Sequence, residues 1–94
     1  MRESTLQKQI IDYMTGRGAY VVNNHGSSYS RKGVADLSIC YKGKYIAVEC
    51  KVGKNKLSEA QKIHIERLNR AGGVSIVPYT LDEFISEFER LTDE

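Results

Sequence analysis

The chain has 94 residues, 40% of them hydrophobic and 28% charged, a composition that predicts one globular domain over residues 1–94 and excludes a disordered chain. Its apolar runs are far shorter than the ~20 residues of a membrane-spanning helix. Charged residues interrupt the first 14 positions, so we expect no signal peptide, no membrane partner and an intracellular location. Two cysteines, Cys40 and Cys50, are too few for a disulfide scaffold or a cysteine-built zinc site, and we expect both to be small buried residues.

The net charge of +2 is unevenly distributed along the chain. Residues 1–80 contain 13 of the 14 Lys and Arg and 6 of the 12 Asp and Glu, a net of +7, whereas residues 81–94 have a net of −5. This asymmetry is typical of a protein that meets a polyanion on one side only. A solvated surface with charges of uneven sign would have the same composition.

The first half of the chain predicts one helix and three strands. Apolar residues at helical spacing indicate a helix over residues 4–15, which two glycines end. A strand over 19–23 follows, and the polar segment 24–33 is expected to be a loop. Two further strands, 36–41 and 44–52, meet at Lys42-Gly43, which is a signal for a tight hairpin.

The second half predicts two helices around a short strand. Ser58 and Gln61 have the spacing of a capping box, which begins a helix that runs to residue 71 with His64 on its inward face. Residues 74–77 form a continuous apolar run and are expected to be a buried strand. Thr80 and Glu83 form a second capping box, and the apolar stripe of the final helix packs on its own sheet or on a second copy. The order αβββαβα predicts an α/β sandwich with a four-stranded mixed sheet.

Charged residues fall on one face of the two central strands. Strand alternation places Asp36 on one face of the first strand, and places Glu49 and Lys51 on one face of the second. A two-residue turn would set Asp36 opposite Glu49, with Cβ atoms ~4.5–5.5 Å apart. A three-residue turn would pair Asp36 with Cys50 and send Glu49 to the other face.

A pair of adjacent carboxylates has a defined chemical use. Two such charges repel unless a cation lies between them, and oxygen ligands favour Mg²⁺ or Mn²⁺. The cluster suits hydrolysis of a phosphodiester, in which Lys51 would steer the water or stabilise charge on the phosphate. The alternative is an ordinary Asp–Lys or Glu–Lys ion pair across a hairpin.

The same residues resemble a known signature. Gly33-Val-Ala-Asp36 followed by Glu49-Cys-Lys51 resembles the PD-(D/E)xK nuclease motif, with Ala35 where that motif often has proline. With Glu3-Ser-Thr-Leu-Gln, Lys56-Leu-Ser-Glu-Ala-Gln61 and Ala71-Gly-Gly-Val added, nearly the whole chain is similar to the VRR-NUC domain.

This resemblance implies a restriction-endonuclease-like fold and a DNA nuclease that depends on Mg²⁺ or Mn²⁺. Carried over by position, Asp36, Glu49 and the backbone carbonyl of Cys50 would bind the metal. Lys51 would be the catalytic lysine. Stand-alone versions of this size are similar to virus-type resolvases, which act as dimers on four-way (Holliday) junctions.

Two further residues acquire roles from the resemblance, and each has a simpler alternative. Gln61 would line the site, or would serve only its capping box. Glu3 would reach the metal through water, or would be a solvated first-turn acid that favours the helix dipole.

Flanking residues complete the expected site. Lysine and arginine side chains in loops beside it are expected to contact phosphate, namely Arg31, Lys32, Lys54 and Lys56. Tyr29 would join them by stacking on bases, although 24–33 would equally suit a plain surface loop. We expect His25 to be a loop residue and His64 a core residue rather than metal ligands.

The sequence therefore predicts a metal-dependent, structure-selective DNA endonuclease that resolves four-way junctions as a homodimer. A nuclease acting on flaps or plain duplex is a rival of the same class. A non-catalytic nucleic-acid-binding module, and a structural subunit that assembles through the acidic final helix, are rivals of other classes.

Overall fold

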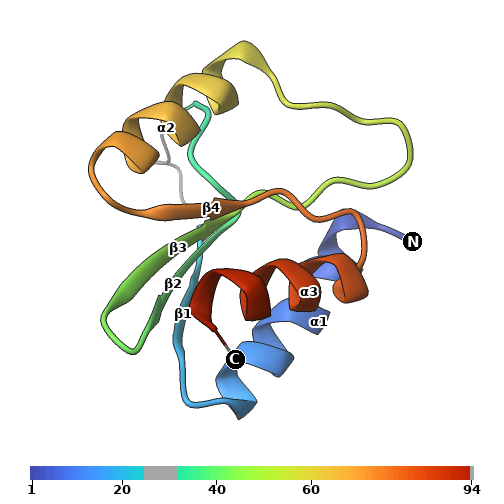
Figure 1. The fold of residues 1–94 in the computed structure, drawn as a ribbon. Helices are drawn as coiled ribbons and strands as arrows, with labels where there is room; N and C mark the ends of the chain where they lie inside the picture. Colours follow the sequence, from blue (N-terminus) through green and yellow to red (C-terminus); the bar gives the residue numbers. More distant parts are fainter. Residues whose placement is uncertain (25–31, 94) are drawn as a thin grey trace.

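The computed structural model describes residues 1–24 and 32–93, so the expectations for His25, Tyr29 and Arg31 lie outside the described residues. The elements are α1 (Glu3–Gly16), β1 (Tyr20–Asn23), β2 (Leu37–Tyr41), β3 (Lys44–Val48), α2 (Glu59–Arg70), β4 (Val74–Ile76) and α3 (Leu81–Thr92), as Figure 1 shows. The predicted order αβββαβα is confirmed. In the part of the chain that the structure describes, no helix is long and apolar enough to cross a membrane.

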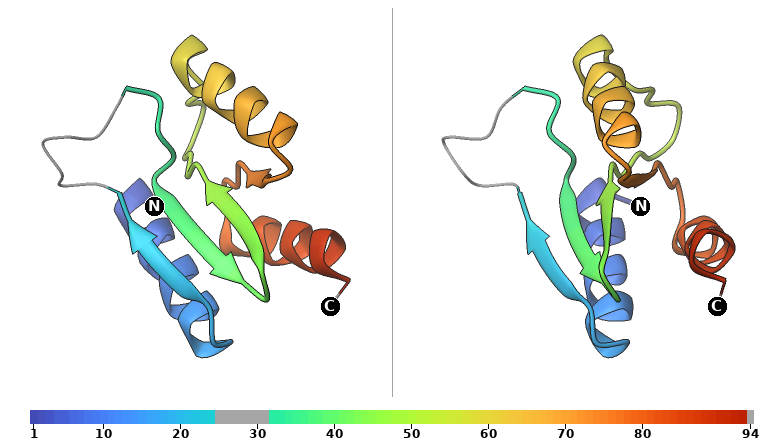
Figure 2. Two further views of the ribbon diagram at one scale, coloured as in Figure 1. Left: turned by 90° about the vertical axis from the view of Figure 1, so that its left-hand side faces the viewer. Right: turned by 60° about the vertical axis from the view of Figure 1, so that its left-hand side comes forward.

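The four strands form one mixed sheet in the order β1-β2-β3-β4. The first three strands are antiparallel neighbours, and β4 runs parallel to β3. Helices α1 and α3 lie on one face of the sheet and α2 lies on the other (Figures 1 and 2). The molecule is thus an α/β sandwich with a four-stranded mixed sheet, as predicted.

The β2–β3 hairpin has the two-residue turn. Lys42 and Gly43 both have positive φ, 48° and 81°, the pattern of a type I′ turn, which matches the twist of the flanking strands. Tyr41 pairs with Lys44, and the ladder continues to Leu37 opposite Val48. One step further along this register, Asp36 faces Glu49, so the three-residue alternative is wrong.

Strand β3 ends earlier than predicted, at Val48 rather than residue 52. Beyond it, the chain still follows β4, because the Glu49 N–H donates to the Ile76 carbonyl (3.0 Å) and the Lys51 N–H donates to the Pro78 carbonyl (3.1 Å). On the other side the β2 ladder ends, and the Asp36 carboxylate accepts the Cys50 N–H instead (2.8 Å). A side chain thus replaces the last rung of the ladder.

The hydrophobic core lies between the sheet and the pair α1 and α3. Its members come from every element except β1 and α2: Leu6, Ile10, Met14, Leu37, Ile39, Tyr41, Ile46, Val48, Cys50, Ile76, Phe84 and Phe88. The rings of Phe84 and Phe88 are fully buried and stack with centroids 6.0 Å apart. Phe84 and Phe88 of the α3 stripe are therefore used inside their own chain, and Leu81, Ile85 and Leu91 pack partly against the same core.

Both predicted helix starts are present. Ser58 Oγ accepts the Gln61 N–H (3.1 Å) and Gln61 Oε1 accepts the Ser58 N–H (2.8 Å), a complete capping box. Before α3, Thr80 Oγ1 accepts the Glu83 N–H (3.1 Å), but the Glu83 carboxylate accepts the Tyr79 N–H (2.8 Å). The second box is thus displaced by one residue.

The packing of α2 differs from the prediction. None of its residues is buried, Ile63 is 51% exposed, and His64 is half-buried rather than a core residue. The reason is its position, because α2 packs against the edge strand β4 and leaves the β1–β2 side of this sheet face uncovered (Figure 2). Cys40, on the β1–β2 side, is therefore exposed instead of buried. Strand β4 is only partly buried, because it is an edge strand.

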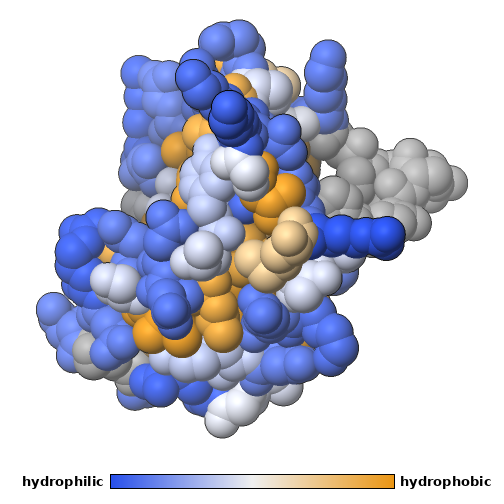
Figure 3. All heavy atoms as spheres, turned by 90° about the vertical axis from the view of Figure 1, so that its right-hand side faces the viewer, coloured by the Kyte–Doolittle hydropathy of each residue, from blue (hydrophilic) through white to orange (hydrophobic). Residues whose placement is uncertain are grey.

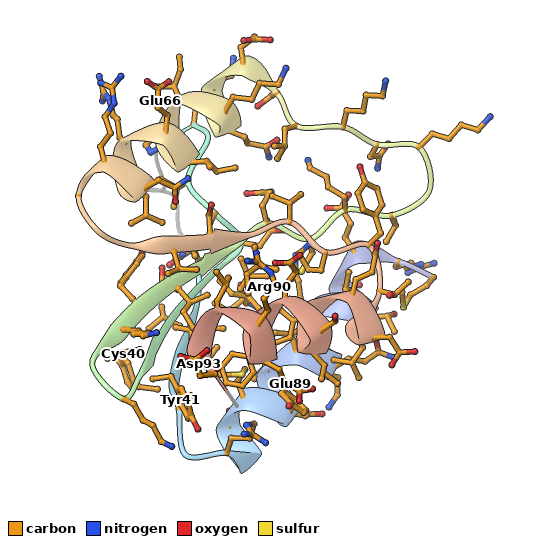
Figure 4. The ribbon with its side chains drawn as sticks, viewed as in Figure 1. Cys40, Tyr41, Glu66, Glu89, Arg90 and Asp93 are labelled. Atoms are coloured by element: carbon orange, nitrogen blue, oxygen red, sulfur yellow. The ribbon has the colours of Figure 1, made fainter. Side chains whose placement is uncertain are left out.

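The surface is hydrophilic over most of its area, with apolar residues in a band across the middle of the face shown in Figure 3. The acidic residues Glu89 and Asp93 lie with α3, on the opposite side of the sheet from α2 (Figure 4). The acidic helix is therefore separated by the sheet from the face that carries Asp36 and Glu49.

Candidate functional site

Four polar or charged residues are buried in the described part of the chain, and three of them form one cluster where β3 ends. Asp36 is 3% exposed, Glu49 is 5% exposed and Lys51 is 8% exposed. Burying charged groups costs free energy unless they are paired or bind an ion. The cluster therefore costs free energy in the folded state, and it is not the ordinary surface ion pair that the sequence left as the alternative.

The position of Asp36 is fixed by backbone groups. Its Oδ2 accepts the Cys50 N–H (2.8 Å), which joins the start of β2 to the chain beyond β3. Its carbonyl accepts the Asn24 N–H (2.8 Å), and the Asn24 amide donates to the Ala35 carbonyl (3.0 Å). The residue is therefore held from both sides, by the chain beyond β3 and by the end of β1.

Two side chains with N–H groups contact the Glu49 carboxylate, and both favour its ionised form. Gln61 Nε2 donates to Glu49 Oε1 (2.9 Å), and Lys51 Nζ lies 4.0 Å from the same oxygen. The amide of Gln61 therefore makes both contacts, because its oxygen caps α2 while its nitrogen donates to the Glu49 carboxylate. This arrangement orients Glu49 from a helix that begins 10 residues after it.

The environment of Glu49 opposes ionisation. Burial, together with the adjacent Asp36 carboxylate, raises the pKa of Glu49 from 4.5 to about 7, although the Lys51 ammonium partly lowers it. Burial also raises the pKa of the Cys50 thiol to about 12, so that side chain stays a neutral core residue as predicted. Two carboxylates pressed together in this way are the electrostatic condition that a bound cation relieves.

The donor set fits a hard divalent cation. The carboxylates of Asp36 and Glu49 provide oxygen ligands. The Cys50 backbone carbonyl would be a third oxygen ligand, on a residue whose N–H donates to Asp36. Within the described residues, no three His, Cys, Asp or Glu side chains gather closely enough to hold a metal by themselves. A site here would therefore use two carboxylates, a backbone carbonyl and water.

Glu3 is close enough to act on the cluster by charge, because it contributes to the raised pKa values of Glu49 and Cys50. Its Oε2 accepts a hydrogen bond from Asn55 Nδ2 (3.3 Å), and the Asn55 carbonyl accepts one from the Tyr79 hydroxyl (2.5 Å). Asn55 thus ties the loop before α2 to the start of α1.

The structure describes three of the four basic residues that were predicted to contact phosphate. Lys32, Lys54 and Lys56 are exposed, the last two in the loop that leads from the cluster to α2. Arg31 lies outside the described residues. The structure thus places two of the four lysine and arginine side chains in a loop that Asn55 anchors to Glu3.

The sequence analysis gave no role to three polar residues that the structure describes. Gln7 is a buried polar residue (8% exposed) one helical turn after Glu3, and that i, i+4 spacing is a signal that could have found it. No local pattern marks Asn55 or Tyr79, because their contacts join segments that are far apart in the chain.

The arrangement defines a class of fold. A mixed sheet between helices, with Asp, Glu and Lys at the end of a central hairpin, is the restriction-endonuclease-like architecture that the signature implied. No protein-family model matches the sequence, and no curated protein matches it either.

Two solved structures have folds similar to that of this chain. One, described as a VRR_NUC domain, is 24% identical, has a TM-score of 0.78, and covers 93% of this chain and 94% of its own. Another is Hjc, a Holliday junction resolvase from the archaeal hyperthermophile Archaeoglobus fulgidus, with 17% identity and a TM-score of 0.62 over 82% of this chain and 67% of its own. The chain therefore has a VRR-NUC-like nuclease fold, which confirms the resemblance at the level of the fold.

Proposed function

We propose that this chain is a metal-dependent DNA endonuclease that hydrolyses phosphodiester bonds. One observation carries the proposal, the burial of Asp36, Glu49 and Lys51 side by side at the end of a strand. A fold that had lost its chemistry would have no need to retain two adjacent buried carboxylates, because their mutual repulsion destabilises it.

The residues divide into ligands and a charge-stabilising group. Asp36, Glu49 and the Cys50 carbonyl would hold Mg²⁺ or Mn²⁺, with Glu3 reaching the ion through water. A bound ion of this kind activates water and neutralises charge on a phosphoryl oxygen. The ammonium of Lys51 stabilises negative charge that grows on the attacked phosphate, and it can also orient the water. Gln61 holds Glu49 in place and is a positioning residue.

We infer that the substrate is branched DNA, with the four-way junction as the preferred form. The support is the similarity in fold to an archaeal Holliday junction resolvase, together with basic loops near the cluster. Junction resolution cuts two strands at symmetry-related positions, and the described residues of this chain form one such cluster, so the working unit would be a two-fold homodimer. Flap or plain-duplex cleavage and non-catalytic binding are the rival functions.

The test offers the purified chain four-way junction, flap and plain duplex of the same sequence, with Mg²⁺, with Mn²⁺ and with a chelator. We expect metal-dependent cleavage of the junction into paired nicked duplexes, and weaker cleavage of plain duplex. Preferred cleavage of the flap would favour the rival nuclease, and tight binding without cleavage in either metal would favour the binding module.

A further inference from the structure

A cavity of about 180 Å³ opens beside Glu49, between α2, β3 and the segment 33–35. Its walls come from the sheet, from α2 and from the segment 33–35, and its main lining residues are Tyr45, Ala47, Glu49, His64, Ile65 and Leu68. Glu49 thus belongs both to the buried cluster and to the wall of this cavity. Whatever enters the cavity lies next to the scissile phosphate of the proposed reaction.

The shape of the cavity depends on small residues. Ala47 on β3 and Ala35 before β2 leave space on the sheet side. Gly33 lets the chain approach α2 closely, because a Cβ there would lie 2.6 Å from the Ala60 carbonyl oxygen and 2.8 Å from His64 Cδ2. Its φ of +89° also favours glycine. The space is thus a consequence of how the segment 33–35 and α2 meet.

The aromatic wall is held in place by hydrogen bonds. The Tyr45 side chain is half-exposed, and its hydroxyl is 2.9 Å from Ser38 Oγ. Asn24 Nδ2 in turn donates to Ser38 Oγ (2.8 Å). This chain of three side chains fixes the Tyr45 ring, so the cavity has a rigid aromatic face on one side and aliphatic side chains of α2 on the other.

The size and lining suit one aromatic ring system. An apolar cavity of roughly 150 Å³ accepts a benzene ring, and this cavity is slightly larger and open to solvent. Proteins that take a base out of its stack receive it between aromatic and apolar side chains. The location beside the proposed reaction centre, inside a face with basic loops, identifies nucleic acid as the source of such a ring.

We propose that this cavity receives one unstacked base of the DNA strand whose phosphate lies at Asp36 and Glu49. The proposal rests on the proposed nuclease function and deepens it, because it specifies the local structure of the substrate. Taking a base from a continuous duplex costs pairing and stacking free energy, whereas a base at a branch point has already lost part of it. The cavity would therefore favour branched over continuous DNA without any contact to sequence.

The test is a double-mutant cycle, which measures whether the effects of removing the Tyr45 ring and of removing one DNA base on binding affinity depend on each other. Four-way junctions carrying one abasic residue, moved through each nucleotide around the branch point, are bound to the wild type and to Tyr45→Ala with the metal chelated. At one position we expect the missing base to weaken wild-type binding about tenfold, since stacking of one base contributes about that much. The affinity of Tyr45→Ala for the junction should not change when the same base is removed.

Three variants control the cycle. Tyr45→Phe keeps the ring that stacks on the base and loses the hydroxyl that contacts Ser38, so it should retain most of the wild-type sensitivity to the abasic residue. Tyr20→Ala removes an aromatic ring that is 72% exposed on the same sheet face but outside the cavity, and it should also retain that sensitivity. Ala47→Leu fills the cavity from β3 and should abolish the sensitivity, which gives a second cycle if Tyr45→Ala does not fold.

The outcomes separate this proposal from the nuclease function. Suppose that the wild type cleaves junctions in Mg²⁺, but that the changes in binding free energy caused by the variants and by the abasic residue are additive at every position. The cavity then does not hold a base, although the nuclease function stands. If the coupling is present but no metal supports cleavage, the base site stands and the proposed nuclease function is wrong. Equal wild-type affinity for all abasic junctions would overturn the base site.

Discussion

At the scale of single residues, the site combines two carboxylates that the fold forces together. Asp36 is committed to the Cys50 N–H and Glu49 to the Gln61 amide, so neither side chain can move away from the other without breaking a buried or part-buried hydrogen bond. Burial, and after it the repulsion from Asp36, raises the pKa of Glu49. The two carboxylates are therefore preorganised for binding a cation.

The raised pKa predicts how the stability of the metal-free protein depends on pH. The folded state holds the Glu49 proton more tightly than the unfolded chain, so this contribution to stability is complete below about pH 4.5 and is lost as the pH rises through about 7. One pKa unit corresponds to about 1.4 kcal/mol, so the free energy of unfolding should fall by on the order of 3 kcal/mol over that range.

Urea unfolding in the presence of a chelator, from pH 4.5 to 8, measures this dependence. Glu49→Gln should remove it, whereas Glu66→Gln, at an exposed position on α2, should keep it. Adding Mg²⁺ should restore stability at the alkaline end, because the ionised carboxylate binds the ion. If the free energy of unfolding of the wild type changed with pH in the same way as that of Glu49→Gln, the raised pKa of Glu49 would be contradicted.

At the scale of elements, the hairpin was predictable and the packing of α2 was not. Lys42-Gly43 is a local signal, and once the turn has two residues the alternation of the strands places Asp36 opposite Glu49. The capping box of α2 was equally local. Which side of α2 meets the sheet depends on the position of β4 and on Gly33, which are remote in sequence, so its exposed Ile63 and the cavity beside it could not be predicted.

The close approach of Gly33 to α2 predicts a difference between two glycines. Gly33 and Gly18 have nearly the same φ, +89° and +87°, but a Cβ meets α2 at Gly33 and open space at Gly18. Gly18→Ala should therefore cost only the backbone term of about 1–2 kcal/mol. Gly33→Ala should cost more, and should also lower cleavage, because it moves α2 and the Gln61 amide relative to Glu49.

Urea unfolding and initial cleavage rates of both variants test this prediction. Equal losses of stability would show that the close approach between Gly33 and Ala60 does not constrain α2. A loss of stability at Gly33 with unchanged cleavage would show that the close approach supports the fold and not the site.

At the scale of the whole molecule, charge is divided between two sides. The acidic helix α3 lies across the sheet from α2, whereas Lys54 and Lys56 lie in the loop that joins the cluster to α2. We expect DNA to bind on the basic side. Its affinity should fall steeply between about 50 and 200 mM salt, since lysines that neutralise phosphates release counterions.

Substitutions in this loop should reduce the salt dependence. Lys54→Ala with Lys56→Ala should lower the slope of log affinity against log salt by about 2, one unit for each phosphate that a lysine no longer neutralises. Lys8→Ala, which removes an exposed lysine paired with Asp12 on α1, should leave the slope unchanged. A slope that is unaffected by the loop variants would move the DNA interface elsewhere.

Junction resolution predicts a homodimer with two clusters. Mixing wild-type chains with Glu49→Ala chains should give particles that nick one strand of a junction without completing the paired cut. The products, separated on native and denaturing gels, distinguish single nicks from resolution. Sedimentation of the junction complex as a monomer that still resolves the junction would exclude this arrangement. Phe84 and Phe88 are buried within their own chain, so of the α3 stripe only its partly buried members, such as Ile85 and Leu91, could contact a second copy.

The central claim is that Asp36, Glu49 and Lys51 form a metal-dependent nuclease site. Its most direct test is the cleavage rate of a four-way junction in Mg²⁺ or Mn²⁺ by the wild type, Asp36→Asn, Glu49→Ala and Lys51→Ala, with folding checked by circular dichroism and Glu66→Gln as the control. We predict that the first two variants lose metal binding and all detectable cleavage, since uncatalysed phosphodiester hydrolysis is extremely slow. Lys51→Ala should lose cleavage while still binding the ion. Unimpaired cleavage by folded Asp36→Asn, or wild-type cleavage that persists in a chelator, would contradict the account.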